Sequence, residues 1–483
     1  MEMSKLSSHK FEKGLFVTPF NTIDNMKLSH WNFERLPAYL WLGLIIKKHG
    51  HTDGLEKCFR IIEFISKKYK TIELPTLNSI FLLDDDSQKE IYEFVSKHVE
   101  PITLAPLTLI YTFSKHPIFN KFFNVQQKND SRKEKLVDVI DETYNHQSEI
   151  STDIRFIIVW SVALTNRLKI SKDLTLVDAL HKYANCSHDD EVMKLYRPTI
   201  RATEGSFGAF MNSMYDQSFN EEFWKEISEM TDCKLFVVNF GNDDDVPEAN
   251  KYLNHIKGIA MYYEEFFRTF KPISKKAEVL LSIFVYSYKR LVELVEHKLY
   301  CEISGRTIAR SLIENYIIIK YLIEEEKNHN NIWEEYMSYG LGQYKLILLK
   351  YKQNETAPKD SHVPINYIEA ILQTETSDAF LNMDTRYFGK KSIREKAILV
   401  KEKDLFDYYY DYDSQFEHGL WGAIRETTSL VCDNPAHKYH HSLDINNQQK
   451  LKSVWDDSKK TMNLIVDYVN QIYPIPDKVK EYE

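Results

Sequence analysis

Glycine and proline are scarce in this chain, and their scarcity limits its possible folds more than any other feature of the sequence. Each accounts for only 14 of the 483 residues, well below typical shares of about 7% and 5%. β-rich folds use both residues in their many tight turns, and parallel-sheet folds place glycine in loops that bind ligands. A long chain that is poor in both is most simply built from long helices with short connections. The sequence therefore predicts an all-α (mainly α) fold.

Composition places the chain among globular proteins. Hydrophobic residues make up 43% and charged residues 28% of the sequence, as in a chain that folds around cores of its own. The length exceeds what one ordinary core supports, so we expect more than one domain. The formal net charge of −9 argues against a protein that coats nucleic acid through a broad basic face. It leaves room for a local cationic pocket.

The cysteines indicate a reducing environment. They are odd in number, widely spaced and never in a CxxC pair: Cys58, Cys186, Cys233, Cys301 and Cys432. This pattern argues against a disulfide framework or a structural zinc site. No stretch approaches about 18 uninterrupted apolar residues, and the first residues lack the apolar core of a signal peptide. We therefore expect a cytoplasmic protein that does not engage a membrane.

A change in local pattern divides the chain between residues 235 and 252. The run KLFVVNF (234–240) is rich in β-branched and aromatic residues, as strands are. The GNDDDVP that follows combines turn formers with a cluster of charge, as a surface loop does. The sequence predicts an N-terminal helical domain of unknown function over residues 1–240 and a C-terminal helical bundle over residues 252–483.

Local signals set several helix ends. Apolar residues at three- and four-residue spacing predict a helix over residues 31–50 that ends at Gly50. Asp84 and Ser87 offer caps for the helix that follows them. In the C-terminal half, residues 401–431 continue a helical pattern.

Charged residues form a stripe on one predicted helix of the C-terminal half. In GRTIARSLIENYIIIKYLI, Arg306, Arg310 and Glu314 stand at i, i+4 and i+8 and so share one face. The remainder of this helix is apolar nearly all the way round, as in a helix buried on most sides. The stripe fits the solvated face of an amphipathic helix with an Arg310–Glu314 pair. It also fits a cation and a carboxylate held at the mouth of a cleft.

A second segment, FDYYYDYDSQFEHGLW, carries the other candidate residues. Tyr410, Ser414 and His418 are spaced by four and are predicted to share a helix face, and Gly419 leaves room for close approach. One interpretation makes His418 a hydrogen-bonded interior residue within a core of tyrosines. The other makes it a catalytic group.

Further charged and imidazole groups have simpler interpretations. Arg197 and Arg201, with Glu204, fit either an anion site or a contact that holds two elements together. The histidines at 437, 440 and 441 have a spacing that suits a metal, but the segment reads as a loop. The signatures of nucleotide loops, zinc proteases and serine hydrolases are absent. We expect no cofactor and no metal.

The residues of these two helices also carry a family resemblance. Over about residues 252–470 the chain resembles an uncharacterised bacterial helical domain family found in phage-defence settings. Its helical architecture is similar to that of the HEPN (higher-eukaryote-and-prokaryote nucleotide-binding) ribonuclease superfamily. The family pairs an Arg-x-x-x-Glu helix with a later Ser-x-x-x-His helix, which fall here on Arg310, Glu314, Ser414 and His418.

The sequence departs from the HEPN pattern at one point. HEPN ribonucleases usually carry Arg and His four to six residues apart on one helix, with a polar residue after the Arg. Arg290 and His297 have that separation, but Leu291 follows the Arg. A site in this chain would therefore be assembled from two helices.

The resemblance implies an RNA-cleaving effector of antiviral defence, of the abortive-infection kind. As a metal-independent endoribonuclease it would use His418 as general acid or base, and Arg310 to stabilise charge on the phosphate. Glu314 would hold the guanidinium of Arg310. The residues expected to bind substrate are Arg306, Ser414 and Tyr410.

The resemblance also bears on partners. An acidic chain with a small cationic site suits RNA in single-stranded loops, and the HEPN likeness implies a homodimer. The alternative is a non-enzymatic helical sensor or scaffold that binds a partner protein of a defence system. In that case the Arg/Glu/His set is a structural polar network. A third interpretation is binding of a small nucleotide at Arg197 and Arg201 or at Arg306 and Arg310.

Overall fold

The chain folds mainly into α-helices, as its composition predicts. The structure, a computed structural model, describes residues 6–18, 30–165, 167–168, 175–210, 216–240, 246–269, 271, 274–354, 361–375, 381–437 and 441–480. Helices dominate this part of the chain, and its strands are short. None of the described helices is long and apolar enough to cross a membrane.

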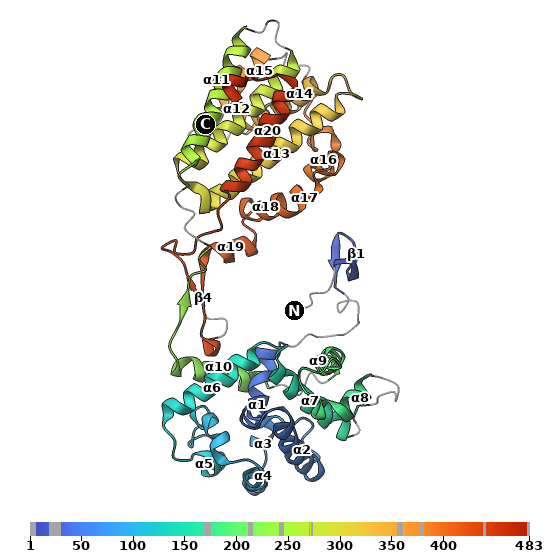
Figure 1. The fold of residues 1–483 in the computed structure, drawn as a ribbon, viewed down its shortest axis with the longest axis vertical. Coiled ribbons are helices and arrows are strands. Elements are labelled where there is room, and N and C mark those ends of the chain that lie inside the picture. The colour runs from blue at the N-terminus through green and yellow to red at the C-terminus, as the bar shows by residue number, and fades with distance from the viewer. Residues whose placement is uncertain are drawn as a thin grey trace. The chain divides into compact units, whose positions relative to one another are not determined.

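Two compact units make up the molecule (Figure 1). The first contains Met1–Phe236 together with Val431–His441, and the second contains Val237–Leu430 together with Ser442–Glu483. The chain therefore leaves the first unit once and returns to it for a short segment. The sequence had placed that segment in the C-terminal domain.

The first unit is built around two helices that are buried over most of their length, α1 and α7. Helices α1 and α2 pack so closely that a Cβ added to Gly54 would lie 2.7 Å from the Cα of Ile46. Its helices are α1 (Leu36–His49), α2 (His51–Lys68), α3 (Leu77–Phe81), α4 (Asp85–His98), α5 (Pro117–Phe123), α6 (Asn129–Tyr144), α7 (Glu149–Leu164), α8 (Thr175–Lys182), α9 (Met193–Phe210) and α10 (Gln217–Met230).

Helix ends in this unit follow the local signals of the sequence. The helix predicted over residues 31–50 forms as a π-helical turn, η3 (Trp31–Arg35), that continues into α1. It ends at Gly50, whose φ of 79° is one that residues with a side chain rarely adopt. Asp84 caps α4 by accepting a hydrogen bond from the Ser87 amide at 2.9 Å. These predictions are confirmed.

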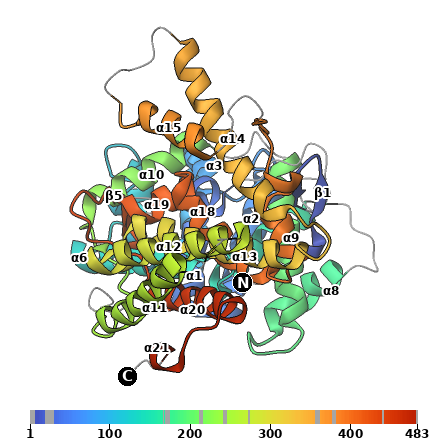
Figure 2. The ribbon, with the colours of Figure 1, turned by 90° about the horizontal axis from the view of Figure 1, so that it is seen from above.

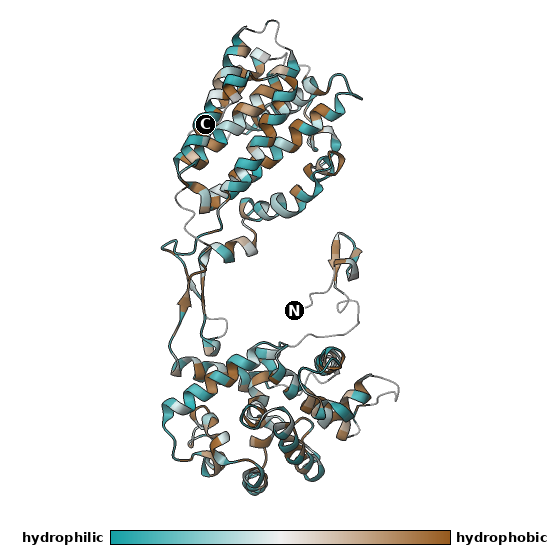
Figure 3. Ribbon diagram, in the orientation of Figure 1, coloured by the Kyte–Doolittle hydropathy of each residue, from teal (hydrophilic) through white to brown (hydrophobic). Residues whose placement is uncertain are grey.

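The second unit is a helical bundle with α13 at its centre (Figures 1 and 2). Helices α12, α20, α18 and α16 pack around α13, which explains why α13 is apolar on most sides. Apolar and polar residues alternate along the other helices, as in amphipathic helices (Figure 3). The helices are α11 (Ala249–Thr269), α12 (Lys275–Glu296), α13 (Ile303–Glu325), α14 (Ile332–Gln353), α15 (Ile365–Glu375), α16 (Ile393–Leu399), α17 (Lys403–Leu405), α18 (Asp411–Glu417), α19 (Trp421–Thr428), α20 (Trp455–Ile472) and α21 (Asp477–Lys480).

The segment with a helical pattern over residues 401–431 forms several short helices. It contains α17, a π-helical turn η10 (Phe406–Tyr410), α18 and α19. Gly419 has a φ of 57° and ends the run, after which Leu420 is extended and caps α19. The residues on both sides of this glycine have helical spacing, so the sequence pattern does not predict the turn.

Short strands complete the fold. The predicted strand in KLFVVNF is limited to β3 (Leu235–Phe236), which pairs antiparallel with β4 (Ser429–Cys432) so that Leu235 is opposite Cys432. Strand β5 (His441–Leu443) adds to β4. A separate hairpin pairs β1 (Lys10–Glu12) with β2 (Leu15–Val17).

Candidate functional site

Four of the predicted site residues meet between α13 and the η10–α18 segment. Arg310 donates from Nε to the Ser414 hydroxyl at 3.0 Å and from Nη2 to the Tyr410 hydroxyl at 2.6 Å. The Tyr410 hydroxyl in turn donates to Glu314 at 2.9 Å. Arg310 Nη2 also lies 3.6 Å from Glu314 Oε2, in a pair whose side chains are partly exposed. The two-helix assembly predicted from spacing therefore brings these four residues together.

Tyr410 is the centre of this network. Its ring stacks on Phe406 at 4.7 Å between centroids, and the Arg310 guanidinium lies 4.6 Å from its centroid. Burial raises the pKa of Tyr410 well above its usual range, the charge of Glu314 adds to the rise, and Arg310 opposes it. The hydroxyl is therefore a neutral hydrogen-bonding group that joins Arg310 to Glu314.

His418 lies apart from this network. It caps the C-terminal end of α18, where its backbone amide bonds to Ser414, and its side chain is exposed. No hydrogen bond or ion pair joins its imidazole to Arg310 or Glu314 within the described residues. The break at Gly419 explains this position, because α18 ends one residue before His418.

Arg306 faces a different feature, a polar pocket at the junction of α13, α18 and α20. The pocket has a volume of about 360 Å³. Arg306 is 5% exposed, donates to the Lys452 carbonyl, and has no partner for its Nε–H among the described residues. The other residues that line the pocket include Tyr408, Tyr409, Tyr412, Asp413, Glu426, Lys452 and Asp457.

Asp413 is the most perturbed acid of this polar pocket. It is 5% exposed and accepts no hydrogen bond from the described residues. Burial raises its pKa to about 7, Arg306 opposes that rise, and the negative charge of Asp457 adds to it. Burial also raises the pKa of Asp457. Asp413 can therefore gain or lose a proton near neutral pH, beside a buried guanidinium.

A family of unknown function matches part of the chain. The family is DUF5677, and the matched residues are 278–437. The match includes α13 and α18, and with them Arg306, Arg310, Asp413 and His418, while Asp457 lies beyond it. No curated protein and no solved structure matches the chain. DUF5677 has no assigned activity, so the likeness to HEPN ribonucleases stays a prediction.

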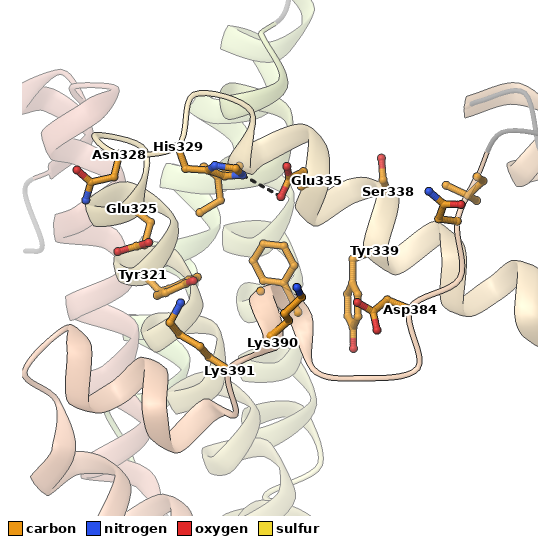
Figure 4. A pocket seen from close by; sticks show the side chains of 15 residues that line it. Tyr321, Glu325, Asn328, His329, Glu335, Ser338, Tyr339, Asp384, Lys390 and Lys391 are labelled. Atoms are coloured by element: carbon orange, nitrogen blue, oxygen red, sulfur yellow. Dashed lines mark ion pairs between the residues drawn. The ribbon is translucent and has the colours of Figure 1, made fainter.

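A larger cavity of the same unit has a mixed lining. It measures about 710 Å³ and lies between α13, α14 and the segment around Lys390 (Figure 4). Figure 4 shows Lys390 and Lys391 on one side, and His329, which pairs with Glu335 at 2.9 Å, on the other. Because both cationic and carboxylate side chains line it, this cavity does not favour a ligand of either charge.

Lys396 lies beneath this cavity and is almost fully buried. Its Nζ donates to the Phe388 carbonyl at 2.7 Å and to the Lys391 carbonyl. Burial and, to a smaller extent, the charge of Lys391 lower its pKa to about 8, while Glu314 opposes the fall. Two backbone carbonyls satisfy the ammonium, so it holds the α16 segment in place.

In the first unit, Arg197 and Arg201 form hydrogen bonds and an ion pair with neighbouring segments. Arg197 bonds to Glu149 at 2.9 Å and to the His188 carbonyl at 3.0 Å. Arg201 donates to the Gln147 carbonyl at 3.1 Å. These bonds hold α9 against its neighbours, as the structural interpretation of these arginines predicts.

A cluster of two histidines and an aspartate lies nearby. His51 Nδ1 is 3.0 Å from Asp153, and His188 Nε2 is 3.4 Å from the same carboxylate. Arg197 donates to His188 Nδ1 at 2.8 Å, so the proton of a neutral His188 stands on Nε2 and points at Asp153. Burial lowers the pKa of His51, but Asp153 outweighs burial and the pKa is raised. This cluster is an ion-pair network. Its imidazole protons point at the carboxylate from the positions where a metal would have to bind, so the cluster does not favour a metal.

The sequence did not single out Asp413 or Asp457. Both stand in helices whose polar faces look solvated in sequence. The sequence contains one weak signal that Asp413 is buried. It follows Tyr409 and Tyr410 by about one helical turn, which places its carboxyl on the side of α18 that faces inward.

Proposed function

We propose that this protein is a metal-independent endoribonuclease of antiviral defence that acts on single-stranded RNA at the polar pocket of Arg306 and Asp413. One observation carries the proposal. A buried guanidinium, whose Nε–H has no partner among the residues that the structure describes, and a buried carboxyl with a pKa of about 7 face one cavity. The defence role and the homodimer rest on the family resemblance, and the cytoplasmic location rests on the cysteine pattern and the lack of long apolar segments.

The rim of the pocket suits unpaired bases. Tyr408, Tyr409 and Tyr412 are 72%, 39% and 42% exposed. Aromatic side chains beside a cation are the usual platform for single-stranded nucleic acid, because each base can stack on a ring while the phosphate meets the charge. The small size of the pocket and the acidic character of the whole chain favour a short flexible loop over a duplex.

The pocket also contains a carboxyl and a guanidinium that such a reaction needs, and His418 lies outside its lining. Asp413, as carboxylate, would accept the proton of a ribose 2′-hydroxyl while that oxygen attacks the adjacent phosphorus. Arg306 would stabilise the charge on the phosphate oxygens. The 5′-oxygen would leave with a proton from His418, which stands on the exposed end of α18. The products would be a 2′,3′-cyclic phosphate and a 5′-hydroxyl.

Arg310 has a positioning role in this proposal. Its hydrogen bonds to Ser414 and Tyr410, and its pairing with Glu314, fix η10 and α18 against α13. Asp413 and Arg306 depend on that arrangement because they stand on the same two helices.

The same bonds favour a second candidate, a non-enzymatic helical scaffold for a partner protein. Arg310 directs its Nε and Nη2 donors to groups of the protein itself, as a network that sets helix register does. In that case the polar pocket is a feature of the bundle and not a substrate site.

A cleavage assay separates the two. The full chain is incubated with end-labelled single-stranded RNA in the presence of EDTA, and the product termini are identified. We expect cleavage by wild type, a loss of about 100-fold or more in Asp413→Asn, and a loss in His418→Ala. Glu417→Gln, an exposed change on the same helix, serves as the matched control and should cleave like wild type.

Two outcomes would overturn the enzymatic proposal. One is a wild-type protein that leaves the RNA intact. The other is cleavage that persists unchanged in Asp413→Asn, with circular dichroism showing that each variant is folded.

A further inference from the structure

Two cysteines and a histidine from distant parts of the sequence converge in the first unit. Cys233 Sγ lies 3.3 Å from His437 Nδ1. The three ligand atoms of Cys233, Cys432 and His437 all lie within 4.8 Å of one another. This cluster is independent of the polar pocket in the second unit.

Strand pairing brings the ligands together. Cys233 stands two residues before β3, and Cys432 ends β4, opposite Leu235. The Asp433 amide donates to the Lys234 carbonyl at 2.8 Å, which extends the pairing past the strand. His437 follows at the end of a single 3₁₀ turn, η11 (Pro435–His437). The backbone therefore fixes all three positions.

Hydrogen bonds around the cluster orient it for a metal. His437 Nε2 lies 2.9 Å from the Thr231 carbonyl and 2.8 Å from the Thr231 hydroxyl. A carbonyl only accepts, so Nε2 carries the proton and the lone pair of Nδ1 points toward Cys233. The Lys234 amide lies 3.3 Å from Cys432 Sγ and donates a hydrogen bond to it, which fixes the position of the sulfur. His437 is 6% and Cys432 is 9% exposed.

We propose that Cys233, Cys432 and His437 bind a zinc ion. Two thiolates and an imidazole are the ligands that Zn²⁺ prefers in proteins. On a tetrahedral zinc, with bonds of about 2.3 Å to sulfur and 2.0 Å to nitrogen, ligand atoms are about 3.5–3.8 Å apart. The separations in the structure fit that spacing with small shifts. The fourth position takes a water molecule or another ligand.

The ion would crosslink the two chain segments of the first unit between which the second unit is inserted in the sequence. Cys233 belongs to the segment by which the chain leaves this unit, and Cys432 and His437 belong to the segment by which it returns. The strands that pair these segments, β3 and β4, are short. A metal that joins them closes a long loop and so stabilises the first unit.

Metal analysis of the purified full chain tests this site. We expect about one zinc per chain by mass spectrometry of the elements, and loss of most of it in Cys432→Ser and in His437→Gln. Cys186→Ser, which changes a partly buried cysteine of the same unit, is the matched control and should keep its zinc. Replacement of zinc by Co²⁺ in wild type should give thiolate charge-transfer bands and the visible bands of tetrahedral cobalt.

The cobalt spectrum keeps the test decisive if a variant fails to fold, because it needs wild type alone. The proposal is overturned if wild type contains no zinc and gives no cobalt spectrum. It is equally overturned if zinc is unchanged in both ligand variants, or if peptide mapping finds a disulfide between Cys233 and Cys432.

Discussion

Asp413→Asn is expected to make the second unit more stable at alkaline pH, although it removes a charged group. The folded protein raises the pKa of this carboxyl from 3.8 to about 7. Between those values the folded state binds a proton that the unfolded state has released. Stability from this group is therefore complete below pH 4 and is lost as the pH rises through 7.

The size of the effect follows from the shift. About three pKa units correspond to about 4 kcal/mol at 1.36 kcal/mol per unit. The carboxyl faces a cavity that water can enter, so we expect about 1–3 kcal/mol at pH 8. Asparagine has nearly the same shape and stays neutral, so the variant should gain this amount over wild type at pH 8 and a smaller amount at pH 5.

Pulse alkylation of Cys301 provides the assay. This cysteine is buried in the second unit, so its labelling in increasing urea reports the unfolding of that unit alone. Midpoints are compared between pH 5 and pH 8, with labelling normalised to the unfolded chain at each pH. Glu417→Gln is the control. Parallel pH profiles for wild type and Asp413→Asn, or an Asp413→Asn variant that is less stable at pH 8, would refute the reasoning.

Three further substitutions test the packing of both units. Tyr410→Phe removes the hydroxyl that joins Arg310 to Glu314. Cys301 labelling should show that the second unit loses about 1–2 kcal/mol of stability; an unchanged stability would mean that this network does not stabilise the unit. Glu204→Gln leaves two buried arginines of the first unit without their carboxylate, and calorimetry should find a loss of about 3–5 kcal/mol. Gly305→Ala places a Cβ 2.1 Å from a backbone carbonyl oxygen and should lower the free energy of unfolding in urea by about 1–3 kcal/mol; wild-type stability would contradict that contact.

Much of the fold could be predicted because local interactions decide it. The scarcity of glycine and proline, the cap at Asp84 and the stop at Gly50 depend on neighbours within one or two turns. The meeting of Arg310 with Ser414 could also be predicted, because both stand at regular spacing on helices that pack together. The mainly helical class is confirmed for these reasons.

Other features depend on residues far away in the sequence. The high pKa of Asp413 comes from burial and from Asp457 on α20, and neither is visible in the sequence around α18. Cys233 lies near Cys432 because β3 pairs antiparallel with β4, and the spacing of the cysteines along the sequence gives no signal of that pairing. Of the three histidines considered for a metal, 437 lies in that cluster, and 440 is outside the described residues.

Crosslinking tests the central claim, that RNA binds at the polar pocket of the second unit. Ultraviolet light joins RNA to aromatic side chains that stack on its bases, and mass spectrometry identifies the joined residue. We predict crosslinks at Tyr408, Tyr409 or Tyr412 of the full chain, reduced in Arg306→Met and preserved in Glu417→Gln. RNA that crosslinks to other segments, or to none, would contradict the account.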